Sequence, residues 1–430
     1  MRHDPIDPAL FRENRRRLVE LLETNSLVVV NANDILPTNA DGSLPLVPNS
    51  DLFYLTGVEQ EQSILLLAPH AFQENLREVL FVRDASEETK VWEGAKLTKE
   101  QAQKISGVKG VRWLSEFPRV FRQLMCEVEH VYLNSNEYKS APCEVPTRDE
   151  RFVRETRAVY PLHCYHRLAR LLHTLRLRKS PPELALLRKA VEITAAGFDR
   201  VLKFTRPSVH EYEIEAEFAH EFIRRRGRFA YTPIIASGQN NCALHYGENN
   251  QVCAAGELLL LDVAASFANY NADLTRTIPV NGRFTPRQRA VYDAVLRVLR
   301  LGVQGATPGK LHRDWQNEAK LAMNEELVRL GLLTAQEAAK HTLDEPACKK
   351  YFMHGLGHPL GLDVHDVGSM SEPIAPGWVL TVEPGIYLPQ EGFGVRLEND
   401  IVVTASGPID LMEKIPIEAE EIELLMHARR

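Results

Sequence analysis

Two aspartates in a hairpin-like pattern are the first residues that indicate chemistry. Asp262 follows the apolar run Leu258–Leu261, and Asp273 lies eleven positions later, before a second β-rich segment. The turn-forming Asn269 and Asn271 between them predict an antiparallel hairpin. Because ten residues separate the aspartates, we expect their carboxylates to face each other directly on one side of the hairpin. Like charges that face each other on adjacent strands are unfavourable unless a cation lies between them, so the pair predicts a metal site. The alternative is that one aspartate is a solvated turn residue.

Three histidines lie close together in a glycine-rich segment further along the chain: His354, His358 and His365. The first two have the i, i+4 spacing of a helical zinc motif, but Gly355 stands where that motif carries its glutamate, and Pro359 opposes a regular helix. The sequence therefore excludes the H-E-x-x-H class of zinc enzymes. A single histidine more often makes structural hydrogen bonds, whereas a cluster among glycines favours a functional site.

Two glutamates follow in strand-like segments. Glu383 lies in residues 381–387 and Glu398 in residues 394–404, each beside turn residues. A glutamate in an apolar strand is costly to bury without a partner. Arg396 lies two residues before Glu398 and so on the same side of a strand; an ion pair between them is one interpretation, and metal binding is the other.

Together these segments supply four carboxylates and one imidazole, enough negative charge to neutralise two divalent cations: Asp262, Asp273, His358, Glu383 and Glu398. Oxygen-rich coordination favours Mn²⁺, with Co²⁺, Fe²⁺ or Zn²⁺ as alternatives. Two such ions can share a bridging water and convert it to hydroxide near neutral pH. Hydrolysis is the expected chemistry.

Composition narrows the class of protein. The chain has 430 residues, of which 44% are hydrophobic and 25% charged, which is typical of a globular protein of two to three domains. Its net charge of −7 argues against nucleic acid or an anionic membrane as a partner. No apolar run approaches the roughly 18 to 20 residues of a membrane span, and charges lie where a signal peptide would be apolar. Six cysteines without a C-x-x-C pair predict free thiols and a cytoplasmic protein.

The elements that must position these residues fall into two predicted domains. Short β-branched runs at 27–30, 64–67, 79–82 and 131–133 alternate with helical stretches and predict an α/β domain over residues 1–175. Residues 48–57 are interpreted as a loop that leads into a strand. Ser180 can cap a helix that begins at Pro181, and similar signals recur at Ser208 and Thr285, so residues 176–430 are predicted to form an α+β domain.

The residues described so far resemble the metal centre of the pita-bread metallopeptidases, specifically the aminopeptidase P family. In the C-terminal domain the similar motifs occur in the family's order: Leu244–Tyr246, 262–277, 354–358 with 364–366, Glu383–Tyr387 and Val395–Glu398. In the N-terminal domain, residues 49–57 and 91–94 are similar to segments of the aminopeptidase P N-terminal domain. The resemblance implies a C-terminal pita-bread (creatinase/aminopeptidase-like) fold and hydrolysis of the N-terminal Xaa-Pro bond.

The resemblance also implies a role for each residue of the cluster. Asp262 would ligate one metal ion, Asp273 and Glu398 would bridge both ions, and His358 and Glu383 would complete the second. Glu383 would also accept a proton from the bridging water.

Four further residues match positions around the family's active site. His245, His354 and His365 would hydrogen-bond the scissile carbonyl region and return a proton to the departing proline nitrogen. Arg396 would support Glu398 and the substrate site. Ala264 stands where many family members have glycine, which matters only if the position needs a positive φ.

Two alternatives remain at this stage. The first is a prolidase, restricted to Xaa-Pro dipeptides by a group that binds the substrate carboxylate. The second is a pita-bread domain that binds peptides or proteins without catalysis. The family resemblance also implies a homo-dimer or homo-tetramer that acts on peptides with proline at the second position.

Overall fold

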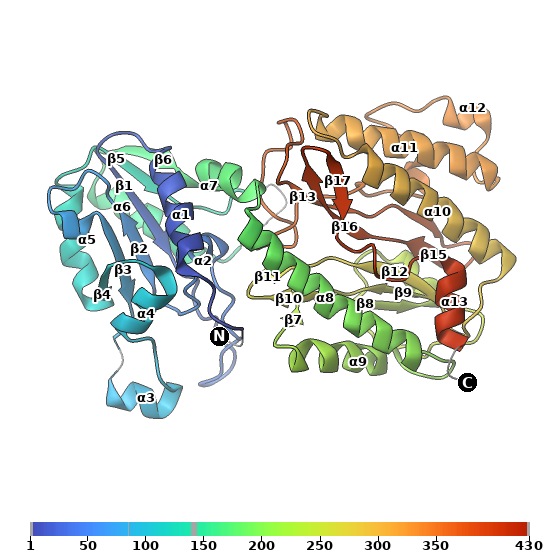
Figure 1. The fold of residues 1–430 in the computed structure, drawn as a ribbon, viewed down its shortest axis with the longest axis horizontal. Coiled ribbons are helices and arrows are strands. Elements are labelled where there is room, and N and C mark those ends of the chain that lie inside the picture. The colour runs from blue at the N-terminus through green and yellow to red at the C-terminus, as the bar shows by residue number, and fades with distance from the viewer. Residues whose placement is uncertain (1–2, 85, 139–143, 428–430) are drawn as a thin grey trace. The chain divides into compact units, whose positions relative to one another are not determined.

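The computed structural model describes residues 3–84, 86–138 and 144–427 and divides into two compact units (Figure 1). The first unit covers His3–Arg176, and the second covers the described residues from Leu177 onward. No helix among the described residues is both long enough and apolar enough to cross a membrane. The five cysteines in these ranges are free, and Cys143 lies outside them.

The first unit is built on a six-stranded mixed sheet that confirms the four predicted strands. Leu27, Val29 and Phe81 point to one face, where they pack with Phe121 and Leu124 in an apolar core. The strands, in spatial order, are β4 (Gly110–Trp113), β3 (Glu78–Val82), β2 (Ile64–Leu67), β1 (Ser26–Asn31), β5 (His130–Leu133) and β6 (Cys164–Arg167). The helices are α1 (Pro8–Val19), α2 (Ser50–Thr56), α3 (Glu87–Glu93), α4 (Lys99–Ser106), α5 (Phe117–Met125), α6 (Arg148–Val159) and α7 (Leu168–Leu177).

The interpretation of residues 48–57 as a loop was wrong, because this segment contains helix α2. The Asn49 side chain accepts hydrogen bonds from the backbone N–H groups of Asp51 and Leu52, as an N-cap does. Gly57 ends the helix with φ of 67°, the left-handed conformation that favours glycine. The turn residues at the two ends of this segment therefore act as helix caps.

The second unit combines long helices with four small sheets. Helix α8 begins at Pro181 as predicted, and the Glu183 carboxylate accepts hydrogen bonds from the backbone N–H and hydroxyl of Ser180. The predicted cap at Ser208 was wrong, because α9 begins after His210. The helices are α8 (Pro181–Phe204), α9 (Glu211–Arg224), α10 (Pro286–Gly305), α11 (His312–Arg329), α12 (Ala335–Ala338) and α13 (Ala419–His427). Helix α8 packs beside α9, and α10 beside α11 (Figure 1).

The acidic residues of the predicted site lie at or just beyond the ends of strands in the second unit. Their apolar side chains share one core with α8 and α10. One sheet has the order β12-β9-β8, one β11-β10-β7, one β13-β16-β17, and β14 pairs with β15. The strands are β7 (Arg228–Phe229), β8 (Ile234–Ser237), β9 (Leu258–Asp262), β10 (Ala265–Phe267), β11 (Tyr270–Asn271), β12 (Thr275–Pro279), β13 (Val379–Val382), β14 (Gly385–Leu388), β15 (Phe393–Arg396), β16 (Asn399–Thr404) and β17 (Gly407–Asp410).

The predicted hairpin is present, but its register differs from the expected one. Asp262 pairs with Thr275, so Asp273 is a diagonal neighbour and does not face Asp262 directly. The cause is a two-residue turn at Ala268 and Asn269, whose φ angles are 51° and 65°. This turn centres the hairpin one position later than direct pairing of the aspartates requires. Because Asp273 lies two residues before Thr275, both carboxylates still lie on one face.

Candidate metal centre

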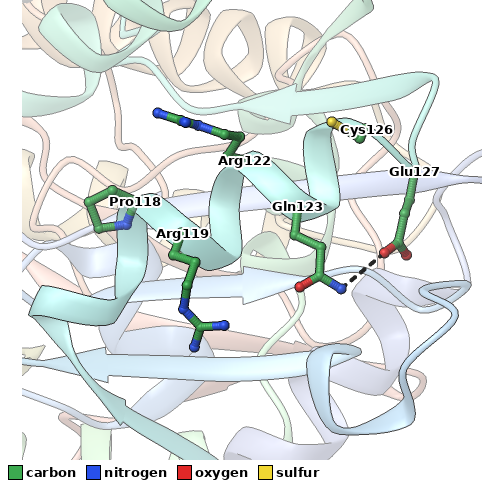
Figure 2. Close-up of a pocket in the computed structure, with 6 residues that line it drawn as sticks. All are labelled: Pro118, Arg119, Arg122, Gln123, Cys126 and Glu127. Carbon is green, nitrogen blue, oxygen red and sulfur yellow. Dashed lines mark hydrogen bonds between the residues drawn. The ribbon is translucent and has the colours of Figure 1, made fainter.

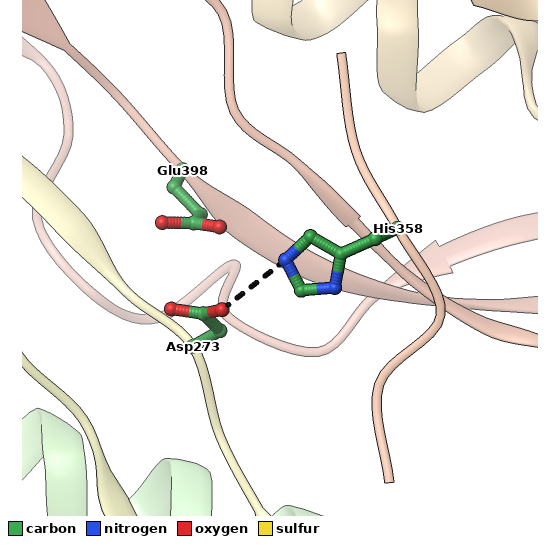
Figure 3. A group of neighbouring side chains, drawn as sticks. All are labelled: Asp273, His358 and Glu398. Carbon is green, nitrogen blue, oxygen red and sulfur yellow. Dashed lines mark ion pairs between the residues drawn. The ribbon is translucent and has the colours of Figure 1, made fainter. Parts of the chain in front are cut away.

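Three predicted ligands meet in one cluster of the second unit. One ligand atom from each of Asp273, His358 and Glu398 lies within 4.8 Å of the other two. Asp273 precedes β12, Glu398 lies between β15 and β16, and His358 lies in an irregular segment. Figure 3 shows the imidazole directed at the two carboxylates, with His358 Nε2 at 3.5 Å from Asp273 Oδ2. Backbone contact between β12 and the segment after β15 brings the acidic residues together, since the Glu398 N–H donates to the Thr275 carbonyl at 3.0 Å.

The remaining two predicted ligands lie beside this cluster. Glu383 follows β13, and its Oε1 is 3.5 Å from His358 Nε2. Asp262 ends β9, and its negative charge contributes, after burial, to the raised pKa of Asp273. The five residues that the sequence singled out are therefore neighbours, and we refer to Asp262, Asp273, His358, Glu383 and Glu398 as the metal centre.

The orientation of His358 is what a cation between these side chains would require. Its Nδ1 is 2.9 Å from the Pro359 carbonyl oxygen, which can only accept, so Nδ1 carries the proton. Nε2 therefore turns a lone pair towards Asp273 and Glu383. Burial lowers the pKa of His358 to about 3, so the ring is neutral near pH 7. A lone pair aimed at carboxylates is unfavourable unless a cation lies between them.

The carboxylates also require a cation close to them. Burial raises the pKa of Asp273 and of Glu398 well above their ordinary values, and neighbouring carboxylates add to the effect. Burial also raises the pKa of Glu383 to about 7. Divalent cations oppose this rise in pKa, because their positive charge stabilises the ionised carboxylates. The donor set and its geometry thus fit divalent metal ions.

Arg396 has a different partner from the expected one. An ion pair with Glu398 was one of two interpretations, but the Arg396 guanidinium donates to Asp262 Oδ2 at 2.5 Å. It also donates to the Tyr387 hydroxyl at 3.0 Å. Because arginine can only donate, the Tyr387 oxygen accepts this bond and its hydroxyl proton is available to His354 Nε2, 2.8 Å away. His354 is thereby linked to Asp262 through two side chains.

The other two predicted histidines lie nearer to solvent. His245 and His365 are exposed, and the rings of His365 and His358 are in edge-to-face contact with centroids 4.3 Å apart. His245 lies close enough to His354 and His365 for its charge to lower, after burial, the pKa of each. Burial lowers the pKa of His354 to about 4. His354 and His365 therefore lie beside metal-centre residues, and His245 lies near both of them.

Sequence reasoning missed several side chains that hold the ligands. The Thr275 hydroxyl donates to Glu398 Oε2 at 2.7 Å, and the Tyr231 hydroxyl donates to Asp262 Oδ1 at 2.6 Å. The Asp273 N–H donates to Asp400 Oδ2 at 3.0 Å. Thr275 could have been found from its position two residues after Asp273 on the same strand face. No comparable signal marks Tyr231.

Ala264 fits its position without strain. Its φ is not among the positive values found in the described residues, so the residue does not need the conformational freedom of glycine. The side chain is buried, and its carbonyl accepts a hydrogen bond from Ala230 N–H at 2.9 Å.

A separate surface pocket of about 590 Å³ lies along α5 in the first unit (Figure 2). Its polar contact joins the Gln123 amide to Glu127 at 3.3 Å. The lining contains two arginines, a cysteine and one carboxylate, and it includes no residue of the metal centre: Pro118, Arg119, Arg122, Gln123, Cys126 and Glu127.

Two family models match the chain. Residues 185–405 match metallopeptidase family M24, and residues 11–132 match the aminopeptidase P N-terminal domain. This chain belongs to metallopeptidase family M24. It is 36% identical over 434 residues to the Xaa-Pro aminopeptidase of Escherichia coli, an alignment that covers 98% of each chain.

Solved structures of family members have the same fold. A structure from Bacillus anthracis, assigned as an aminopeptidase P, has a TM-score of 0.92 at 32% identity and covers 99% of both chains. Zinc-substituted Escherichia coli aminopeptidase P in complex with product has a TM-score of 0.87 at 34% identity, with 99% of this chain and 100% of that chain covered. The predicted family and fold class are confirmed. As a family M24 member with a carboxylate and imidazole cluster, the chain is a metal-dependent peptide hydrolase.

Proposed function

We propose that this chain is an aminopeptidase that hydrolyses the first peptide bond of peptides with proline as the second residue. The observation that carries the proposal is the meeting of three carboxylates and a neutral imidazole in one cluster, with the charge of Asp262 close by. The near full-length similarity to proteins named Xaa-Pro aminopeptidase supports the choice of substrate. Residues 1–175 form the N-terminal domain and residues 176–430 the catalytic domain in this proposal.

The metal centre would hold two divalent ions, with Mn²⁺ favoured by the predominance of oxygen ligands. Asp262 would bind one ion, Asp273 and Glu398 both, and His358 and Glu383 the second. Bound ions would polarise the scissile carbonyl and lower the pKa of a water molecule. The Nε2 lone pair of His358 and the raised pKa values of the carboxylates support this arrangement.

The protein's own groups would move the protons. Glu383, whose Oε1 lies 3.5 Å from His358 Nε2, would accept a proton from the attacking water. His245, His354 and His365 would hydrogen-bond the scissile carbonyl region and protonate the departing proline nitrogen. Arg396 holds Asp262 and, through the Tyr387 hydroxyl, fixes the ring of His354. The carboxylates would also hold the free amino terminus of the peptide and so limit cleavage to the first bond.

Two expectations on the protein's context belong to the proposal. A homo-dimer or homo-tetramer is expected on family grounds. A cytoplasmic location is expected from the cysteine pattern, and the free thiols among the described residues are compatible with it.

The test is hydrolysis of Ala-Pro-Ala beside Ala-Pro and Ala-Ala-Ala by Mn²⁺-loaded protein. We expect rapid cleavage of Ala-Pro-Ala alone, and a fall of at least 10²-fold in kcat for Glu383→Gln, which retains the size of the side chain. Glu391→Gln is the matched control, because Glu391 pairs with Arg287 at the surface.

Each other outcome has a definite meaning. Cleavage of Ala-Pro without Ala-Pro-Ala would assign the chain as a prolidase. Cleavage of Ala-Ala-Ala at the same rate would contradict the requirement for proline. Failure to cleave any of the three peptides by protein with two bound ions would favour a binding module.

A further inference from the structure

A buried ion pair lies next to the segment that carries the histidines, outside the metal centre itself. Lys179 precedes α8, and Asp366 directly follows His365. Lys179 Nζ is 2.9 Å from Asp366 Oδ2, and the two side chains are only 2% and 1% exposed. Desolvating both charges is costly, and a pair of apolar side chains can give equal or greater stability in such a position. The pair therefore requires an explanation other than stability.

The residues between His354 and Asp366 form no helix and no regular strand. Fixing an irregular backbone costs conformational entropy, so contacts from elsewhere must hold it. Asn271 holds the middle of the segment, because its backbone N–H and its amide both donate to the Gly361 carbonyl, at 2.9 and 3.1 Å. Gln316 on α11 holds the start, since its amide donates to the Gly357 carbonyl at 2.9 Å.

The Lys179–Asp366 pair holds the other end and packs against the turn. A Cβ atom at Gly361 would lie 2.2 Å from Asp366 Oδ2 and 2.8 Å from Lys179 Cε, so only glycine leaves room for the pair. Lys179 is itself fixed, because its N–H donates to the Gly377 carbonyl at 2.8 Å, just before β13. The ammonium group thus connects a fixed backbone point to the end of the histidine-bearing turn.

A single carbonyl links this ion pair to the His358 ring. The Asp366 N–H donates to the Pro359 carbonyl at 2.9 Å. The same carbonyl accepts His358 Nδ1–H at 2.9 Å, and this bond directs Nε2 towards Asp273 and Glu383. A shift of Asp366 would therefore change the acceptor that orients the imidazole.

We propose that Lys179 is a positioning residue: by holding Asp366 it fixes the turn that orients His358 and carries His365. The inference rests on the proposed function for the role of the metal centre. Lys179 contacts none of the five metal-centre residues in the described structure, so its effect passes through Asp366 and the Pro359 carbonyl.

The test measures Mn²⁺ binding to metal-stripped full-length protein by calorimetry, together with the thermal midpoint of the metal-free form. We expect Lys179→Met to weaken Mn²⁺ binding by 10- to 100-fold, the range found when partners that orient metal ligands are removed. Lys189→Met is the matched control, since Lys189 lies on α8 and pairs with Glu192 at the surface. Its Mn²⁺ affinity should equal that of the wild type.

A double variant separates positioning from stability. Lys179→Met with Asp366→Asn leaves no unpaired buried charge, so it should fold even if the single variant does not. We expect its midpoint to recover towards the wild-type value while its Mn²⁺ affinity stays at least tenfold weaker. The proposal would be overturned if the folded double variant bound Mn²⁺ with wild-type affinity. It would also be overturned if Lys179→Met had a lower thermal midpoint but wild-type Mn²⁺ affinity. Wild-type protein that binds Mn²⁺ but does not cleave Ala-Pro-Ala would contradict the proposed function and leave this comparison intact.

Discussion

Replacing Thr275 with valine should weaken metal binding, because it removes the hydroxyl that holds Glu398. The Thr275 hydroxyl is fully buried, donates to Glu398 Oε2 at 2.7 Å and accepts from Arg396 Nε at 3.2 Å. Valine keeps the shape but turns a methyl group towards the carboxylate. A hydrogen bond to a charged group contributes about 1.5–3 kcal/mol. Since about 1.4 kcal/mol corresponds to a factor of ten, Mn²⁺ affinity should fall by roughly 10- to 100-fold.

The assay is Mn²⁺ titration of metal-free protein, with kcat/KM for Ala-Pro-Ala measured on the same samples. Thr194→Val is the control, because the Thr194 hydroxyl is also buried but bonds only to backbone groups of Ala190 and Ala265. Both variants should lose stability, and only Thr275→Val should lose Mn²⁺ affinity. Binding within twofold of wild type by folded Thr275→Val would refute the role assigned to this hydroxyl in holding Glu398.

Three further perturbations test other parts of the structure. Tyr387→Phe removes the hydroxyl between Arg396 and His354, so kcat for Ala-Pro-Ala should fall by about 10- to 100-fold with a smaller change in KM; an unchanged kcat would contradict the linkage. Chelation should lower the thermal midpoint, and Mn²⁺ should restore it; at 100 times Kd the bound ion should add about 2.7 kcal/mol to the free energy of unfolding, and a metal-independent midpoint would argue against the site. Burial raises the pKa of Asp149 to about 6, so the native state binds more protons than the unfolded state between pH 4 and 6, and stability falls as pH rises through that window. Asp149→Asn should therefore stabilise the protein by up to about 3 kcal/mol at pH 8 and by almost nothing at pH 4, as measured by urea unfolding.

The sequence predicted those features that depend on local patterns of side chains. The apolar runs before Asp262 and in the first unit are strands, because a short continuous apolar run bounded by turn residues is a signal of only a few residues. The cap at Ser180 was correct for the same reason, since a capping box spans only four residues. The prediction for residues 48–57 failed because Asn49 and Gly57 favour turns and helix ends alike. The seven-residue helix between them has too few turns to show a helical period.

The errors in the site arise where a single backbone conformation decides the outcome. Direct pairing of Asp262 with Asp273 follows if the hairpin turn is centred between them, but the turn at Ala268 and Asn269 moves the register by two residues on one strand. Asn269 favours a positive φ but alanine does not, so the sequence does not place the turn at this particular pair of residues. Of the two interpretations of Glu398, the ion pair with Arg396 is not the one found, since Arg396 pairs with Asp262, which is distant in the sequence.

The metal centre illustrates why ligands are easier to predict than the groups that hold them. Ligands must be carboxylates or imidazoles, and such residues are conspicuous when they interrupt apolar strands. The groups that orient them can be any donor or acceptor at the right place, including the Pro359 carbonyl that fixes the His358 ring. Because His358 lies in an irregular segment, its position depends on contacts from Lys179, Asn271 and Gln316, all more than forty residues away in the sequence. Substitutions at these remote positions should therefore affect metal binding more than their distance from the ligands in the sequence indicates.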